Sequence, residues 1–116
     1  MSDCIFCKII RGELPSKKIH EDSDLIVFHD ISPKAPVHVL ITSKRHIVSL
    51  IEVKPSDQDL LGKIMLAANM IAKKLGLDKG GFKVVINNGE GSGQLVNHLH
   101  LHLLGGWKKG AKGWEV

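Results

Sequence analysis

Three histidines alternate with leucines near the end of the chain, in the segment 98–104, which reads His-Leu-His-Leu-His-Leu-Leu. Successive side chains of a β-strand point to opposite faces, so this alternation predicts a strand. The three imidazoles should project from one face, while the leucines enter a hydrophobic core. Imidazole titrates near neutral pH and can act as a nucleophile, a proton carrier or a metal ligand. Three imidazoles on one rigid surface favour a reaction centre or a metal site over an ordinary polar face.

The size of the chain suits one compact domain. It has 116 residues, of which 43% are hydrophobic and 24% are charged, and this composition is typical of globular proteins. We therefore expect a single domain over residues 1–116, with a C-terminal tail from about residue 107. We find no secretory signal and no apolar run of membrane-spanning length. The expected location is the cytoplasm, without a membrane partner.

The formal net charge of +4 comes from scattered lysines rather than from a continuous basic surface. Lys17 and Lys18 form one basic pair, and Lys108, Lys109 and Lys112 lie in the tail. These blocks are too short, and too poor in aromatic residues, to indicate a nucleic-acid groove. A modest positive field is compatible with a small phosphorylated substrate.

The predicted elements follow the order short helix, three strands, long helix, two strands. This segregation favours an α+β fold with an antiparallel sheet of about five strands, one long helix and one short helix. The long helix should begin at Ser56, whose hydroxyl can cap the first amides, and should end at Gly76. The helices and strands are expected over 4–11, 19–21, 25–29, 37–42, 56–76, 82–87 and 98–104.

A glycine-rich segment over 87–94 joins the last two predicted strands. It matches neither the P-loop nor the dinucleotide-binding motif, because it connects strand to strand. A flexible loop tip is one interpretation. Its position beside the histidine strand favours another, in which exposed backbone N–H groups hold phosphate oxygens. Asn87 and Gln94 can add amide donors to the same cluster.

The only two cysteines, Cys4 and Cys7, form a CxxC pair near the start of the chain. In a cytosolic protein this spacing indicates metal ligation or redox chemistry more often than a structural disulfide. The redox interpretation needs a preceding strand, and none is predicted before Cys4. Metal ligation would require a second pair of ligands elsewhere in the sequence.

Several segments together resemble the histidine triad (HIT) family, in particular its Hint branch of nucleoside phosphoramidases. They are the histidine segment 98–104 with Gly93 and Gln94 upstream, the segment 28–38, and the ending 103–106. The resemblance is collinear from Cys4 to about Gly106. It implies a homodimeric protein with a HIT-like α+β fold that binds a purine nucleoside monophosphate.

The resemblance also implies a role for each matching residue. His100 would attack the α-phosphorus and form a nucleotidyl-histidine intermediate, which water would then hydrolyse. A neutral imidazole is nucleophilic when one nitrogen is free and the other donates to a fixed acceptor. His102 or a water would bring the proton for the leaving amine. Asp30 would contact the ribose hydroxyls, although an aspartate before a proline-bearing loop can also simply stabilise a turn. The base pocket would contain Phe6, Ile9, Leu14 and Phe28, and the phosphate would meet Asn87, Gly93, Gln94 and His102, with His38 close by.

Some bacterial-type members of the family carry a zinc ion held by a CxxC pair, a further histidine and the first histidine of the triad. These positions match Cys4, Cys7, His46 and His98. Two cysteines and two histidines form a suitable tetrahedral set for a structural Zn²⁺. The ion would anchor the N-terminal helix to the histidine strand. The alternative is a surface CxxC pair with an unrelated His46.

The sequence departs from the Hint pattern at three places. Leu95 stands where Hint phosphoramidases commonly have a serine that contacts the leaving group, and leucine has no polar group. Asn97 replaces the aromatic residue usual before the triad. The tail over 107–116 does not match the Hint tail, which approaches the partner subunit's site, and Trp114 is the residue that would do so here.

The leading interpretation is a hydrolase of purine nucleoside 5′-phosphoramidates. One alternative is a dinucleoside polyphosphate hydrolase of the same family. Another is a nucleotide-binding regulatory protein whose turnover is incidental. A pure metal-binding module is disfavoured by His100 and by the glycine-rich segment.

Overall fold

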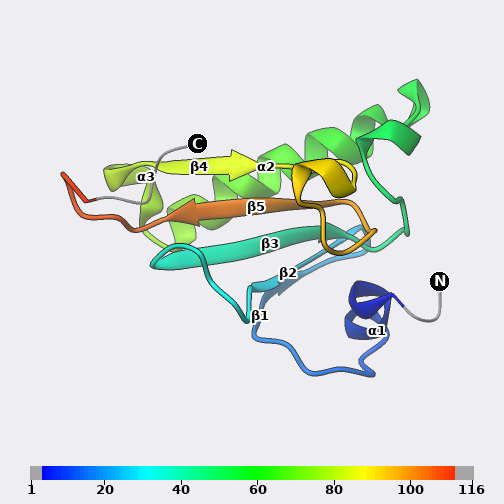
Figure 1. Cartoon of the computed structure of the whole chain (residues 1–116), viewed down its shortest axis with the longest axis horizontal. Helices are drawn as coiled ribbons and strands as arrows, with labels where there is room; N and C mark the ends of the chain where they lie inside the picture. The colour runs from blue at the N-terminus through cyan, green and yellow to red at the C-terminus, as the bar shows by residue number, and fades with distance from the viewer. Residues whose placement is uncertain (1–3, 112–116) are drawn as a thin grey trace.

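The computed structural model describes residues 4–111 and contains one five-stranded antiparallel sheet, ordered β1-β2-β3-β5-β4 (Figure 1). Trp114 and the end of the predicted tail lie outside the described residues. The α+β class and the five-stranded sheet are confirmed. The strands are β1 (Lys18–Glu21), β2 (Leu25–His29), β3 (Val37–Ser43), β4 (Phe82–Val85) and β5 (His100–Gly105). The helices are α1 (Ile5–Ile10), α2 (Gln58–Lys74) and α3 (Leu77–Gly80), and three short 3-10 turns cover Leu50–Glu52, Pro55–Asp57 and Glu90–Ser92.

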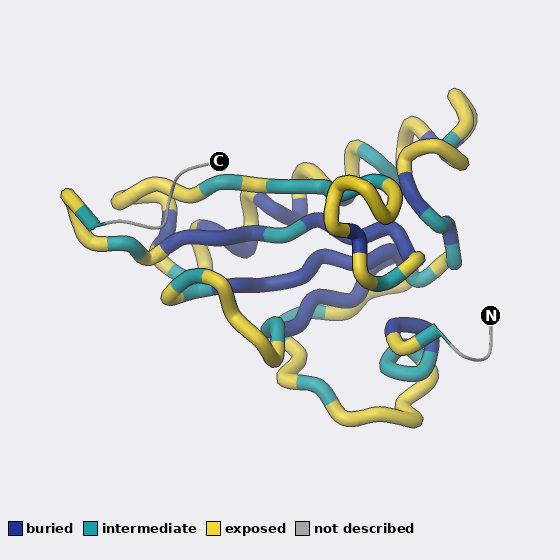
Figure 2. The backbone as a smooth tube through the Cα atoms, in the orientation of Figure 1, coloured by how far each residue is buried: buried dark blue, intermediate teal, exposed yellow. Residues whose placement is uncertain are grey.

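The two main helices cover opposite faces of the sheet (Figure 1). Helix α2 packs on the face that carries the alternating leucines of β5, which together with Ile41 and Ile71 form the larger core. Helix α1 packs on the other face, where Phe6 meets Ile26, Phe28 and Leu40. Figure 2 shows that the central strands are buried along most of their length. The histidines of β5 therefore lie on the same face as α1.

The last strand starts two residues later than predicted. The β5 ladder begins at His100, opposite Thr42 of β3, and His98 precedes it. The alternation of side chains nevertheless extends back to Leu99, which is 1% exposed in the larger core. The backbone N–H of Leu99 donates to the carbonyl of Ile47, so this part of the chain is held without being part of the ladder.

The start of the long helix was predicted incorrectly. Helix α2 begins at Gln58, and Ser56 lies in the preceding 3-10 turn. Asp57 takes the N-cap position of α2, and its side chain makes no hydrogen bond to the first amides of the helix. Its carboxylate instead stabilises the preceding turn, because it accepts from the N–H of Lys54 at 2.9 Å and pairs with the Arg45 guanidinium. The predicted end is confirmed, because Gly76 adopts a left-handed φ of 75° directly after the helix. The short helix α3 that follows was not predicted.

None of the helices within residues 4–111 combines the length and the apolar character that crossing a membrane requires.

Candidate active site and metal centre

His100 is buried at the start of β5, and its ring is held by a backbone carbonyl. Its Nδ1 lies 2.6 Å from the carbonyl oxygen of His98, so Nδ1 carries the proton and donates it. The lone pair of the neutral ring is then on Nε2. Burial lowers the pKa of His100 below its ordinary value, which keeps the ring neutral at pH 7. This tautomer satisfies the two requirements for a nucleophilic imidazole.

Aromatic packing restricts the movement of the His100 ring. The ring of Phe6 meets it edge to face, with centroids 4.9 Å apart and an interplanar angle of 89°. Phe6 also meets Phe28 at 5.5 Å and His98 at 5.9 Å. Since Phe6 belongs to α1, the N-terminal helix forms one wall beside the candidate nucleophile.

His102 belongs to a hydrogen-bonded chain that runs through His38. The backbone N–H of Lys34 donates to His38 Nδ1 at 3.0 Å, so the proton of neutral His38 is on Nε2. That nitrogen lies 2.9 Å from His102 Nδ1 and donates to it. His102 therefore carries its own proton on Nε2. Burial, with His100 and His38 nearby, lowers the pKa of His102 to about 4.

A cavity of about 550 Å³ brings the predicted nucleotide residues together. It contains all three candidate catalytic histidines and every predicted nucleotide contact except Gln94. One part of its lining is aliphatic and aromatic, and another part is polar. In the polar part, Oδ2 of Asp30 lies 3.4 Å from Nε2 of His38. Its lining includes Phe6, Ile9, Leu14, Phe28, Asp30, His38, Asn87, Gly93, His100 and His102.

Gln94 has a different place from the one expected. Its side chain is 5% exposed and holds the glycine-rich segment in shape instead of lining the cavity. The amide nitrogen donates to the carbonyls of Val48 and Val96, and the amide oxygen accepts from the N–H of Gly89 at 2.7 Å. The predicted phosphate contact from this side chain is therefore not supported, since its polar atoms already have partners within the protein.

The cavity lining also contains residues that the sequence reasoning missed, among them His29, Ile31 and Lys34. For these three residues a signal was available, because they lie in the segment 28–38 that carries Phe28, Asp30 and His38. His20, by contrast, lies outside this cavity and pairs with Asp22 at 3.0 Å.

The side chains of Cys4, Cys7, His46 and His98 converge in one cluster, as the predicted metal set requires. Four separations between their Sγ and Nδ1 atoms range from 3.1 to 3.6 Å. A tetrahedral zinc with Zn–N of about 2.0–2.1 Å and Zn–S of about 2.3 Å has ligand atoms about 3.3–3.8 Å apart. The cluster therefore has dimensions close to those of a zinc site.

Hydrogen bonding favours metal binding by His98. Its Nε2 lies 2.6 Å from the carbonyl oxygen of Ser43 and donates to it, so Nδ1 presents a lone pair to the cluster. Burial raises the pKa of the Cys7 thiol, so a cation is needed to stabilise the thiolate there.

A second cluster of possible ligands, Asp30, His38 and His102, does not suit a metal. The Nε2 atom of His38 that faces the other two residues carries a proton, because the N–H of Lys34 occupies Nδ1. Binding a cation would require that proton to leave while no other ring position can accept it. These three residues lie close together because of the hydrogen bond between His38 and His102, with Asp30 beside it.

Comparison with known proteins agrees with this geometry. The family model of the HIT domain matches residues 11–109. This chain belongs to the HIT family. It is 49% identical to protein HitA of Neisseria gonorrhoeae over 105 residues, which are 90% of this chain and 97% of that protein.

Solved structures of HIT proteins share the fold of this chain. A HIT family hydrolase from Clostridium thermocellum has a TM-score of 0.91 and 46% identity over 97% of both chains. A histidine triad nucleotide-binding protein from Candida albicans has a TM-score of 0.80 and 38% identity, over 95% of this chain and 86% of that one. A zinc-bound histidine triad family protein from Mycobacterium smegmatis has a TM-score of 0.83 and 30% identity, over 97% of this chain and 80% of that one.

Proposed function

We propose that this HIT protein is a hydrolase of purine nucleoside 5′-phosphoramidates, of the Hint type, that works through a nucleotidyl intermediate on His100. The observation that carries the proposal is the hydrogen bond from His100 Nδ1 to the His98 carbonyl, which leaves Nε2 as the nucleophile within the cavity. Two similar proteins, a HIT family hydrolase and a histidine triad nucleotide-binding protein, support the same class of activity.

The cavity lining supports a nucleotide as the ligand. Ile9, Leu14 and Phe28 offer apolar surface suited to a purine ring. Asp30 offers a carboxylate to ribose hydroxyls, although its Oδ1 also accepts from the N–H of Ser32 in the turn. The Nε2–H of His102 would donate to a phosphate oxygen.

The proposed reaction has two displacements. The lone pair of His100 Nε2 attacks the α-phosphorus, and the P–N bond breaks as the amine leaves with a proton. His102 is neutral at pH 7 because of its lowered pKa, so this proton would come from water. The hydroxide that remains from this water then attacks phosphorus, which breaks the P–Nε2 bond, releases the nucleoside monophosphate and returns His100 to its neutral form. The carbonyl of His98 stabilises the positive ring of the intermediate through Nδ1–H.

The test is rapid quenching in an alkaline denaturant, in which a phosphorus–nitrogen bond to histidine survives, with adenosine 5′-phosphoramidate labelled at phosphorus. We expect label on the protein during turnover, no label on His100→Ala, and a rate at least about a thousandfold lower for that variant. Calorimetry with AMP should show that the variant still binds nucleotide. Product formation without a protein adduct, or substantial activity of His100→Ala, would rule the proposal out.

Leu95 favours a dinucleoside polyphosphate hydrolase as the second candidate. This residue is 94% exposed, lines the cavity, and has no group that can donate a proton to a leaving amine. A phosphate leaving group needs no such proton. The same assay with diadenosine polyphosphates separates the two activities, because the better substrate should show the higher kcat/KM.

We propose in addition that Cys4, Cys7, His46 and His98 hold a structural Zn²⁺. The separations and the orientation of His98 support this, and the Mycobacterium smegmatis relative is described as zinc-bound. The bound ion would attach α1 to the histidine strand. It would thereby hold Phe6 against His100 without taking part in the reaction.

We further propose a homodimer formed through the β4 edge and helix α2. Val84 on the edge strand is 38% exposed, and Met65, Leu66 and Met70 on α2 are 52%, 70% and 43% exposed. Unpaired strand edges beside apolar surface favour association with a second copy. Sedimentation should give twice the mass of one chain, and the substitution Leu66→Lys should shift the measured mass toward that of the monomer.

A further inference from the structure

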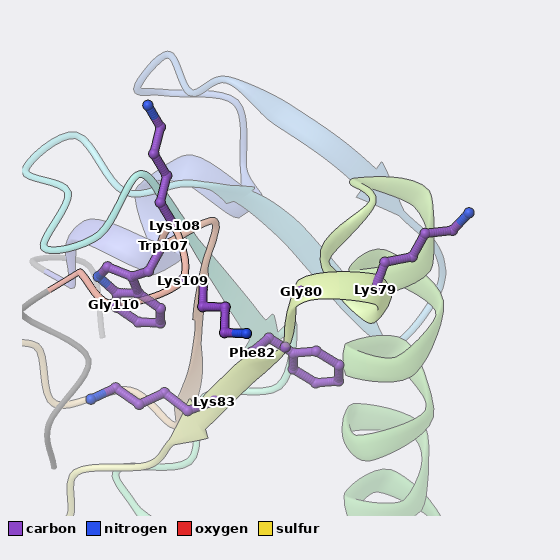
Figure 3. Close-up of a pocket in the computed structure, with 9 residues that line it drawn as sticks. Lys79, Gly80, Phe82, Lys83, Trp107, Lys108, Lys109 and Gly110 are labelled. Carbon is purple, nitrogen blue, oxygen red and sulfur yellow. The ribbon is translucent and has the colours of Figure 1, made fainter.

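A second hollow, of about 520 Å³, lies where β4 begins and the chain leaves β5 (Figure 3). It is lined by residues 79–83 on one side and 107–110 on the other. None of these residues lines the nucleotide cavity. The volume is within the range of about 300–1,000 Å³ that is usual for small-ligand sites.

The lining of this hollow is strongly basic. Among the described residues that line it, the charged ones are all lysines: Lys79, Lys83, Lys108 and Lys109. Within the part of the chain that the structure describes, no ion pair neutralises Lys79, Lys108 or Lys109. In Figure 3, Lys83 extends toward Trp107 and Lys109 toward Phe82, while Lys79 and Lys108 extend outward. The charge is therefore gathered from two segments that are far apart in the sequence.

One of the ammonium groups is positioned by an aromatic ring. Lys83 Nζ lies 5.7 Å from the centroid of the half-buried Trp107 ring, within cation–π distance. This contact holds the cation beside the hollow. It also makes Trp107 a fluorescent reporter for anything that binds there.

We propose that this hollow binds a small oligophosphate anion with two or more phosphoryl groups. Lysine ammonium groups bind phosphate as point charges. The described residues of the lining include no arginine, so they do not offer the two-pronged recognition of a carboxylate. Among the described residues of the lining there is no acidic residue, and Lys79, Lys108 and Lys109 alone bring three positive charges that no ion pair of the described chain neutralises, which favours a ligand with several negative charges. The ring of Trp107 is already engaged by Lys83, so recognition does not depend on a stacked base.

The test is calorimetric titration of the full chain with inorganic tripolyphosphate. We expect one site per chain, with binding that weakens as salt is added. The double variant Lys83→Gln/Lys109→Gln should bind tripolyphosphate at least about tenfold more weakly. Lys17→Gln/Lys73→Gln removes the same charge outside the hollow and should bind like the unmodified chain. In a Trp114→Phe background, tripolyphosphate should change the emission of Trp107.

Two further titrations identify the source of the phosphates. ATP and AMP are compared in the same variants, because the nucleotide cavity is expected to bind both. If the phosphate chain of a nucleotide is the ligand, ATP will lose affinity in the Lys83/Lys109 variant and AMP will not. The proposal is overturned if tripolyphosphate does not bind, if the two lysine variants weaken binding equally, or if binding leaves Trp107 emission unchanged.

Discussion

The ring of His100 is oriented by the backbone of His98, whose carbonyl oxygen lies 2.6 Å from Nδ1 of His100. The same His98 directs its own Nδ1 toward Cys4 and Cys7. One residue therefore connects the candidate metal centre with the candidate nucleophile, through its side chain on one side and its backbone on the other.

Loss of His38 should impair turnover more than binding. His38→Phe keeps a ring of similar size but removes the donor to His102 Nδ1, so the tautomer of His102 is no longer determined. We expect kcat for adenosine 5′-phosphoramidate to fall by about a hundredfold with little change in KM. His20→Phe, outside the cavity, is the control and should behave like the unmodified enzyme. A change confined to KM would contradict the positioning role.

Stability should depend on the protonation of His102. Burial first, and then His100 and His38, lower its pKa in the folded protein from 6.5 to about 4. The unfolded chain therefore binds this proton at higher pH than the folded chain does. The contribution of neutral His102 to the free energy of unfolding is complete only above pH 6.5. That contribution decreases as the pH falls from 6.5 toward about 4. Urea unfolding across this range should show a smaller loss of free energy for His102→Gln, and equal losses would contradict the assignment.

Replacing one cysteine of the pair should remove the metal and weaken the fold. Elemental analysis of the intact chain should find about one zinc per chain, and Cys4→Ser should lose most of it. Without the ion, α1 keeps only its apolar contacts, so the melting temperature should fall. Chelator treatment should lower the melting temperature of the intact chain and leave that of Cys4→Ser unchanged. An equal effect of chelator on both proteins would exclude this site.

A buried hydroxyl beside the candidate nucleophile makes Thr42→Val a stabilising change. Thr42 is 0% exposed, lies opposite His100 in the sheet, and its Oγ1 has no hydrogen-bond partner within the described part of the protein. Valine has nearly the same shape without the polar atom, so the free energy of unfolding should rise by about 1 kcal/mol. Ser43→Ala is the contrast, because that hydroxyl donates to the Arg45 carbonyl at 2.9 Å. Its loss should cost about 1 kcal/mol.

A hydroxyl at position 95 should improve cleavage of the P–N bond. Leu95→Ser places a donor in the cavity lining, where the leucine has none. We expect kcat/KM for adenosine 5′-phosphoramidate to rise by about fivefold, which corresponds to one modest hydrogen bond of about 1 kcal/mol. Ile51→Ser, at a residue that is also highly exposed but outside the cavity, should have no effect. If kcat/KM of Leu95→Ser does not rise, the leaving group lies away from position 95.

Local patterns were sufficient for most of the architecture. The alternation over 98–104 predicted which face each side chain takes, because that depends only on the geometry of the strand. The end of α2 shortly before Gly76 followed from the preference of glycine for left-handed φ. The start of α2 did not follow, because Ser56 lies in a 3-10 turn, and the Asp57 carboxylate that holds this turn has as its partner Arg45, which is distant in the sequence.

The sequence alone determined the alternating strand, the order of the elements and the types of residue that the site would contain, since these depend on the local periods of helix and strand. Only the tertiary structure decided which atoms of those residues are free. It turned Gln94 inward, gave His100 and His102 their tautomers, and brought Cys7 within 3.6 Å of His98 across 91 positions of the chain. Hydrogen bonds and metal sites join residues that are distant in the sequence, so their partners are set by how the sheet and α1 pack rather than by any local pattern.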